Sequence, residues 1–412
     1  MPNKQSQRWR PFKMKKAPLP TPFAQYRASL SELDACALDA FYAECDRHCA
    51  LPGGEKRKLL ADFENALLYY QKTGVPLADA LARLDATYLG GFYLRPPILW
   101  YSLDDAAKIY PLSMRHGQMA VFRLSAYLKE AVVPELLQLA LTFTIKRFPS
   151  FATTVKQGFF WHYLDTAKRR YAVEPETDIP CRPLRIGHSG SQSFRVLYHQ
   201  NRISVEYFHI LTDGTGGMTF LKTLTAEYLR LLGADIPAGN GILSVNEPPK
   251  ADETANEFTR AKKVEKASGF VDKMALQLSG RLSKVKPCQI LHFKMDAAML
   301  KAAAKRRGAT VTAYILALLF LACKASTDEL TGEFSIQVPV NMRKFYPSDT
   351  VRNFAMYASI RLPVTQTTAL DAILPEIARQ LAQRTSEEAM GEKRNIRFLK
   401  YTILHCTANG SS

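Results

Sequence analysis

The stretch Arg202–Gly217, RISVEYFHILTDGTGG, contains the residues best suited to chemistry. His209 and Asp213 are separated by three residues, and Gly214 follows Asp213 directly. An unperturbed imidazole has a pKa of about 6.5, so much of it is neutral near pH 7 and able to take a proton from a hydroxyl or an amine. A positioned base typically contributes ~10²–10⁴ in rate. These residues suggest a histidine general base, with Asp213 fixing the adjacent turn through an arginine.

The elements on either side of His209 determine where its side chain points. Alternating apolar and polar residues predict a strand over 203–209, with His209 on the same side as the apolar Ile203, Val205 and Tyr207. Glycines at 214, 216 and 217 indicate a break, and apolar residues then recur at helical spacing from Met218. We therefore expect His209 at the mouth of an inward-facing strand, beside a turn that opens a helix.

Other chemistries fit this stretch less well. A strand end and a glycine turn separate His209 from Asp213, and no third ligand is evident, so no metal site is expected. GTGG lacks the lysine and the spacing of a phosphate-binding loop. Gly187-His-Ser189 lacks the second glycine of a nucleophile elbow. A purely structural histidine is the alternative that these observations leave open.

Composition is that of an ordinary globular protein, with 412 residues, 47% hydrophobic and 23% charged. Seven cysteines without a visible disulfide framework favour a reducing compartment. No apolar segment follows the basic N-terminus, so no secretory signal is expected. The longest apolar run, Val311–Cys323, falls short of the ~20 residues that span a bilayer. These features predict a cytoplasmic protein in which Val311–Cys323 is a buried helix.

The formal net charge is +17. Residues 1–22 contribute six basic side chains and no acid: Lys4, Arg8, Arg10, Lys13, Lys15 and Lys16. No RNA-binding aromatic motif or recognition helix accompanies the basic clusters, so a nucleic-acid partner is not expected. The excess charge fits solvated faces plus a mobile tail. Attraction to a phosphate-rich ligand such as coenzyme A, or peripheral contact of the tail with an anionic membrane, is the alternative.

Breaks in the pattern divide the chain into five parts. These are a basic flexible tail (1–27), a helical extension (28–95), a first lobe (96–240), a crossover linker (241–285) and a second lobe (286–412). The second lobe is expected to begin with a strand over Ile290–Met295 and a helix capped by Asp296. The helix Val311–Cys323 follows, then a strand over Phe334–Val340 and a helix over Asp371–Arg384.

Several stretches in order resemble a known superfamily. They are WYSLDDAAKIYP (100–111), FRLSAYLKE (122–130), RFPSF (147–151), GFFWHYL (158–164), FHILTDGTGG (208–217) and VPVNMRKFYPSDTVRNF (338–354). FHILTDG is similar to the H-x-x-x-D-G signature of the chloramphenicol acetyltransferase-like acyltransferases, which include the condensation domains of peptide synthetases. The likeness is greatest to bacterial alcohol acetyltransferase-like proteins. It covers about residues 99–360 and implies an α/β (α+β) fold of two lobes.

The resemblance assigns roles to five residues. It implies that His209 is the general base, at a tunnel between the lobes that both substrates enter. It implies that Asp213 is structural and pairs with an arginine of the second lobe, for which Arg343 is the candidate. Asn353 would mark a loop that completes the site, and Gly214 would let the turn pass close to the substrate.

The expected activity is acyl transfer, here acetyl transfer, from acyl-CoA as a co-substrate to a small alcohol, with no cofactor. One alternative is a condensation-type enzyme that takes acyl groups from a carrier protein to form esters or amides. A second is a catalytically degenerate module that binds a membrane or partner through its basic tail. Relatives continue with further strands where this chain ends in IRFLKYTILHCTANGSS, so an incomplete second lobe is also expected.

Overall fold

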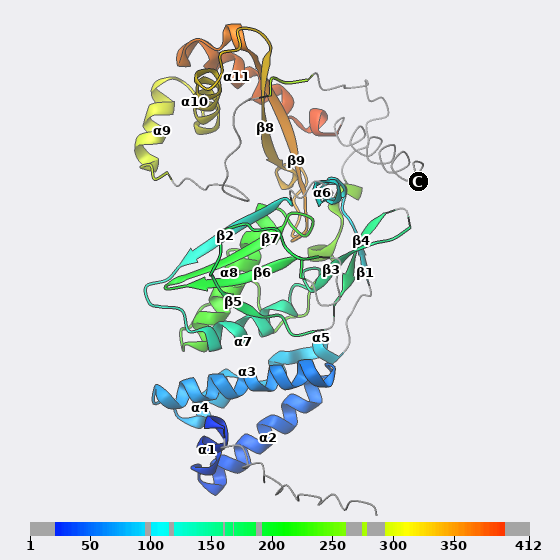
Figure 1. The fold of residues 1–412 in the computed structure, drawn as a ribbon, viewed down its shortest axis with the longest axis vertical. Coiled ribbons are helices and arrows are strands. Elements are labelled where there is room, and N and C mark those ends of the chain that lie inside the picture. Colours follow the sequence, from blue (N-terminus) through cyan, green and yellow to red (C-terminus); the bar gives the residue numbers. More distant parts are fainter. Residues whose placement is uncertain are drawn as a thin grey trace, which may run out of the picture.

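The computed structural model describes residues 21–94, 100–114, 119–159, 161–167, 169–186, 192–260, 274–277 and 293–391. Three parts follow one another along its longest axis (Figure 1). A set of helices from the N-terminal part comes first, then a first lobe with two sheets, then a second lobe built on a pair of strands. The basic residues 1–20 lie outside the described residues.

The N-terminal part consists of helices, as the sequence predicts. They are α1 (Pro22–Ala28), α2 (Glu32–His48), α3 (Gly53–Lys72), α4 (Leu77–Arg83) and α5 (Gly90–Leu94), with a short 3-10 helix η1 (Ala86–Leu89). The prediction of a tail reaching residue 27 is wrong for 22–27, which form most of α1. Thr21 caps this helix by accepting from the Ala24 N–H, Pro22 suits its first turn, and Phe23 is buried.

The helical extension and the first lobe share one hydrophobic core. Helix α7 (Pro134–Ile145) lies between α3 and the strands, and every residue from 136 to 145 is buried (Figure 1). The Phe143 ring contacts Phe63 of α3 and Tyr88 of η1, and the Tyr93 hydroxyl donates to Thr142 O at 3.0 Å. A helix that is apolar on all sides needs cover on all sides, and the extension supplies the outer cover.

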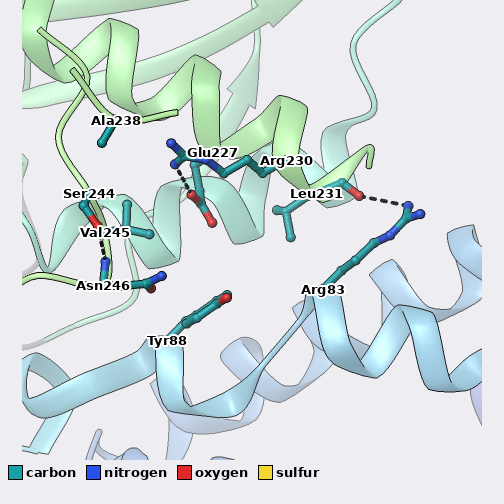
Figure 2. Close-up of a pocket in the computed structure, with 9 residues that line it drawn as sticks. All are labelled: Arg83, Tyr88, Glu227, Arg230, Leu231, Ala238, Ser244, Val245 and Asn246. Atoms are coloured by element: carbon teal, nitrogen blue, oxygen red, sulfur yellow. Dashed lines mark hydrogen bonds and ion pairs between the residues drawn. The ribbon is translucent and has the colours of Figure 1, made fainter. Parts of the chain in front are cut away.

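Polar contacts join the extension to the first lobe around a small pocket (Figure 2). Arg83 of α4 and Tyr70 of α3 both donate to Leu231 O, at 3.5 and 2.6 Å. On the first-lobe side, Arg230 donates to Glu227 at 2.9 Å, and burial raises the pKa of the Glu227 carboxyl. None of the five residues that the sequence singles out for chemistry lines this pocket, so it belongs to the packing of the extension.

The first lobe contains a four-stranded sheet in the order β2 (Val121–Tyr127), β7 (Arg202–Phe208), β6 (Phe194–His199) and β5 (Val173–Pro175). Neighbours are antiparallel except β5 and β6, which are parallel. Helix α8 (Gly214–Leu231) packs on β2 and β7. A three-stranded antiparallel sheet, in the order β1 (Trp100–Ser102), β4 (His162–Thr166) and β3 (Thr153–Gln157), stands beside it. The strand predicted over 203–209 is present but ends one residue before His209.

The second lobe contains α9 (Ala297–Arg306), α10 (Val311–Ala325), β8 (Glu333–Asn341), β9 (Ala355–Pro363) and α11 (Leu370–Arg384). The predicted cap at Asp296 is confirmed, because its side chain accepts from the Met299 N–H. The strand predicted over 290–295 is not found at 293–295, and 290–292 lie outside the described residues. Helix α10 is buried on one face only, since Leu318 and Leu319 are exposed, so the prediction of a fully buried helix is wrong.

Strands β8 and β9 pair along their whole length, from Glu333 opposite Pro363 to Asn341 opposite Ala355. This ribbon runs from the helices of the second lobe down to the first lobe (Figure 1). The connection between the two strands, residues 342–354, is therefore delivered to the first lobe. It begins with a 3-10 helix, η5 (Met342–Lys344), and is called the 342–354 loop below.

Two of the predictions made from the sequence concern segments that lie partly or wholly outside the described residues. The linker 241–285 is described at 241–260, where two short 3-10 helices occur (Ala251–Thr254 and Glu257–Thr259), and at 274–277. The expected shortening of the second lobe concerns residues 392–412, which lie outside the described part of the chain. Within the described part, no single helix is long and apolar enough to cross a bilayer. Helices α9 and α10 reach that length and composition only together, with a bend of 86° between them.

Candidate active site

His209 lies one residue beyond β7, in a position fixed by backbone and ring contacts. Its N–H donates to Ala120 O, just before β2, at 2.8 Å. Its imidazole stacks on the Tyr110 ring, with centroids 4.6 Å apart and planes 19° apart, and contacts the Phe122 ring at 4.9 Å. The side chain is half-buried. Two aromatic rings of the first lobe thus restrict the rotation of the imidazole.

The 342–354 loop brings Asn353 to the imidazole. His209 Nδ1 lies 3.1 Å from Asn353 Oδ1. The Asn353 amide nitrogen donates to His209 O at 2.9 Å and to Ile210 O at 3.3 Å, which identifies its oxygen as the atom facing the ring. An amide oxygen only accepts, so Nδ1 carries the hydrogen when His209 is neutral. Nε2 is then the basic nitrogen.

Asp213 caps α8 and joins it to the second lobe. One carboxylate oxygen accepts from the N–H groups of Thr215 and Gly216, both at 3.1 Å. The other accepts from Arg343 Nη1 at 2.7 Å and from the Phe354 N–H at 2.8 Å. Both side chains of the ion pair are nearly buried. The pairing of Asp213 with Arg343 that the resemblance implies is therefore present. The hydrogen bond of the His209 ring goes to Asn353 and does not involve Asp213.

Arg343 also organises the loop that carries Asn353. Its Nη2 donates to Thr350 O at 2.6 Å and to Arg352 O at 3.0 Å. On the opposite side, the Thr212 hydroxyl donates to Val351 O at 2.6 Å. The turn that follows His209 and the 342–354 loop are thus bonded to each other both before Asn353, at Val351, and after it, at Phe354.

The close approach in the glycine turn occurs at Gly216, which the sequence marks only as part of a break. A Cβ at Gly216 would lie 2.0 Å from Val351 O and 2.4 Å from Thr212 Oγ1. At Gly214, where closeness to substrate was expected, a Cβ would meet no protein atom within 4 Å. The glycine at 216 is thus required by the contact between the two lobes.

We predict that Gly216→Ala lowers the free energy of unfolding by about 1–3 kcal/mol or more, because Val351 and the rest of the loop must move away. Gly214→Ala is the matched control, two residues earlier in the same helix turn. It is expected to change stability by no more than about 1 kcal/mol. Denaturant unfolding of both variants measures the difference, and equal effects would contradict the assigned contact.

A buried carboxylate, Asp104, lies beside the loop as well. One oxygen accepts from the Ala107 N–H at 2.7 Å, while Oδ2 lies 3.7 Å from Arg352 Nη2 and accepts no hydrogen bond from the described residues. Burial raises the pKa of Asp104 to about 6, against the opposing effect of Arg352, and the carboxylates of Asp213 and Asp105 add to the rise. Arg352 itself donates to Ser102 O and to Thr254 O.

Asp104 is expected to make stability depend on pH in a defined direction. Its pKa is raised in the folded state, so the stabilisation is fully present below the unfolded value of about 3.9 and is lost as pH rises through about 6. Between pH 4 and 6 the wild type should therefore lose thermal stability relative to Asp104→Asn. Asp178→Asn, which breaks an exposed pair with Arg182, is the control and should leave this slope in place. An unchanged slope in Asp104→Asn would contradict the assignment.

Three residues near the site, Asp104, Tyr110 and Arg352, lie in the stretches that carry the resemblance, but the sequence did not indicate their roles. WYSLDDAAKIYP contains Asp104 and Tyr110, and VPVNMRKFYPSDTVRNF contains Arg352. Their roles were not evident because no spacing within these stretches predicts a contact with a residue 99 or more positions away. Among the described residues, no three His, Cys, Asp or Glu side chains gather in a way that would hold a metal ion.

Comparison with known proteins gives a likeness of fold. No protein-family model and no curated protein sequence matches the chain. Polyketide synthase associated protein 5 from Mycobacterium tuberculosis is similar in structure, with a TM-score of 0.50 at 13% identity over 71% of this chain and 75% of that one. The X-domain from teicoplanin biosynthesis gives a TM-score of 0.49 at 15% identity, covering 72% of this chain and 73% of its own. Trichothecene 15-O-acetyltransferase from Fusarium sporotrichioides gives 0.48 at 13% identity, covering 75% and 76%. The chain thus has a two-lobed α/β fold similar to that of polyketide synthase associated protein 5.

Proposed function

We propose that the protein is an acyltransferase that moves an acyl group, here acetyl, from acyl-CoA to the hydroxyl of a small alcohol. The observation that carries this proposal is the bond from His209 Nδ1 to Asn353 Oδ1, which leaves Nε2 as the basic nitrogen. The histidine comes from one lobe and its orienting amide from the other. That arrangement suits a base acting at the meeting point of two substrates.

The proposed chemical step uses this geometry. Nε2 of His209 takes the proton of the acceptor hydroxyl as the oxygen attacks the thioester carbonyl. The resulting imidazolium is stabilised by Asn353 Oδ1, which accepts from Nδ1. The C–S bond then breaks, and the departing thiolate takes the proton from Nε2, giving an ester and free coenzyme A. No protein nucleophile and no cofactor enter this step, since the substrates supply both reacting groups.

The remaining site residues position the base. Asp213 holds the first turn of α8 and, through Arg343, the 342–354 loop, so its proposed role is structural. Asn353 is the positioning residue that contacts the ring directly. Gly214 faces open space at the start of the helix, which is compatible with a nearby substrate. A cytoplasmic location, where acyl-CoA is made and used, is part of the same proposal.

The donor is the feature that separates this proposal from a condensation-type activity. We expect free thiol to appear when the protein is mixed with acetyl-CoA and a panel of small alcohols, and the matching ester to appear with it. The same protein is then given an acyl carrier protein loaded with the same acyl group, with alcohols and with amines. Turnover with the carrier alone would replace the proposed donor, and turnover with neither donor would leave a binding module as the function.

A further inference from the structure

The three-stranded sheet of the first lobe ends in an exposed aromatic tip. Strands β3 and β4 form a hairpin that projects from the lobe (Figure 1). In its turn the Gly158 N–H donates to Trp161 O at 2.7 Å, and Phe159 is 86% exposed. Trp161 is 56% exposed, and Trp100 on the neighbouring strand β1 is 52% exposed.

These side chains form one continuous surface. Residues 163 and 165 of β4 point to the same face of the sheet, and Trp161 precedes the strand by one residue, at the next position of this alternation. Trp100 lies opposite Asp165 in the register. Its ring meets the Tyr163 ring edge to face, with the ring centroids 6.2 Å apart. Phe159 lies in the turn that joins β3 to β4. We call these four residues, Trp100, Phe159, Trp161 and Tyr163, the aromatic tip.

The size and shape of the aromatic tip argue against a stable protein partner. Aromatic side chains bury roughly 150–250 Å² each, so its three exposed rings offer roughly 400 Å². A stable protein interface buries about 800 Å² on each partner. The surface is also a projecting hairpin rather than a groove, so a partner would need a matching cavity.

Its chemistry suits the surface of a lipid bilayer. Tryptophan and other aromatic side chains favour the boundary between water and hydrocarbon, where an apolar ring and a polar edge are both satisfied. The charge is complementary to anionic lipid, because the chain carries a formal +17. Between residues 150 and 172 there are four basic residues, Lys156, Lys168, Arg169 and Arg170, and one acid, Asp165. Lys156 pairs with Asp165 and Arg170 pairs with Asp62, so the local excess of positive charge comes from residues 168 and 169.

We propose that the aromatic tip docks the protein on the surface of an anionic bilayer by inserting Phe159 and Trp161 at the headgroup level. Basic side chains attract the protein to the membrane, and the rings then enter it. From Trp100, strand β1 leads within ten residues to Tyr110, which stacks on His209. Docking would place the candidate site close to apolar substrates dissolved in lipid. The proposal concerns binding and does not depend on acyl transfer.

The sequence provides its own probe. Trp9, Trp100 and Trp161 are its three tryptophans, so in a Trp9→Phe background all indole emission comes from the aromatic tip. Without lipid, we expect emission typical of exposed indole that acrylamide quenches readily. Vesicles of phosphatidylcholine and phosphatidylserine should shift the emission to shorter wavelength, and lipids brominated on their acyl chains should quench it. Vesicles of phosphatidylcholine alone should do so less.

Phe159→Ser in this background retains both indoles and is expected to weaken partitioning by about tenfold or more. Leu33→Ser is the matched control, because Leu33 is 81% exposed on α2, in another part of the molecule. It should partition like the parent, and thermal unfolding should show both variants folded. Deleting residues 1–20 should weaken binding without preventing the emission shift.

Four results would overturn the proposal. They are emission unaffected by any vesicle, equal partitioning of Phe159→Ser and its parent, indoles already shielded in the lipid-free protein, and self-association that Phe159→Ser abolishes. The third would mean that another part of the chain covers the aromatic tip. The fourth would mean that a second copy does so.

Discussion

Replacing Arg343 with methionine is expected to lower the free energy of unfolding by about 3–5 kcal/mol, because it leaves the carboxylate of Asp213 buried without its cation. The same change removes the donors to Thr350 O and Arg352 O, so the 342–354 loop loses its internal organisation. Activity should then fall by more than the unfolded fraction explains, since Asn353 would no longer be held against His209.

Two further variants separate charge from geometry at this pair. Arg343→Lys retains the cation but cannot present the planar donors that reach Asp213 and two carbonyls together, so it should recover only part of the loss. Asp213→Asn removes the charge and keeps an oxygen for the N-cap of α8. A double-mutant cycle of Asp213→Asn with Arg343→Met gives the coupling energy from denaturant unfolding. A coupling energy near zero would contradict a structural pair.

Replacing His209 with alanine is expected to lower the rate of acyl transfer by about 10²–10⁴, the contribution of a positioned general base. Thiol release from acyl-CoA with a saturating alcohol measures it. His199→Ala, at the exposed end of β6, is the matched control and should retain full rate. Equal rates for the wild type and a folded His209→Ala would show that the histidine is structural.

Asn353→Leu tests how the base is oriented. The variant keeps His209 but removes the oxygen that accepts from Nδ1 and the amide that donates to His209 O and Ile210 O. We expect a smaller loss of rate than in His209→Ala, together with a shifted pH–rate profile, because the imidazolium loses its acceptor. Lost stability with an unchanged pH profile would assign Asn353 to loop packing alone.

The local elements that hold the site could be predicted because short-range signals define them. Alternation predicts β7, and the cap at Asp296 predicts the start of α9. The helix expected from Met218 is present, but it begins earlier, at Gly214, because Asp213 caps it. These features depend on residues within a few positions of one another, where propensity and hydrogen bonding act directly.

The contacts that make the site depend on distant residues, and the sequence does not encode their distance. Gly216 could be assigned to a break but not to a close contact, because the atom that it approaches is Val351 O, 135 residues away. Strand β9 was not predicted, although its apolar residues alternate with Tyr357, Ser359 and Arg361 along the sequence. The pairing of Asp213 with Arg343 was expected only through resemblance. The boundary at residue 27 failed because a short helix, capped by Thr21, begins inside the basic region.

A single-turnover reaction tests the central claim most directly. Wild-type protein in excess is mixed with labelled acyl-CoA and an alcohol, quenched at successive times, and separated into ester, thioester and protein fractions. A base acting between two bound substrates predicts that ester and free coenzyme A rise together while the protein never acquires the label, and that His209→Ala slows both. Label accumulating on the protein before ester appears, or no ester with any acceptor, would contradict the account.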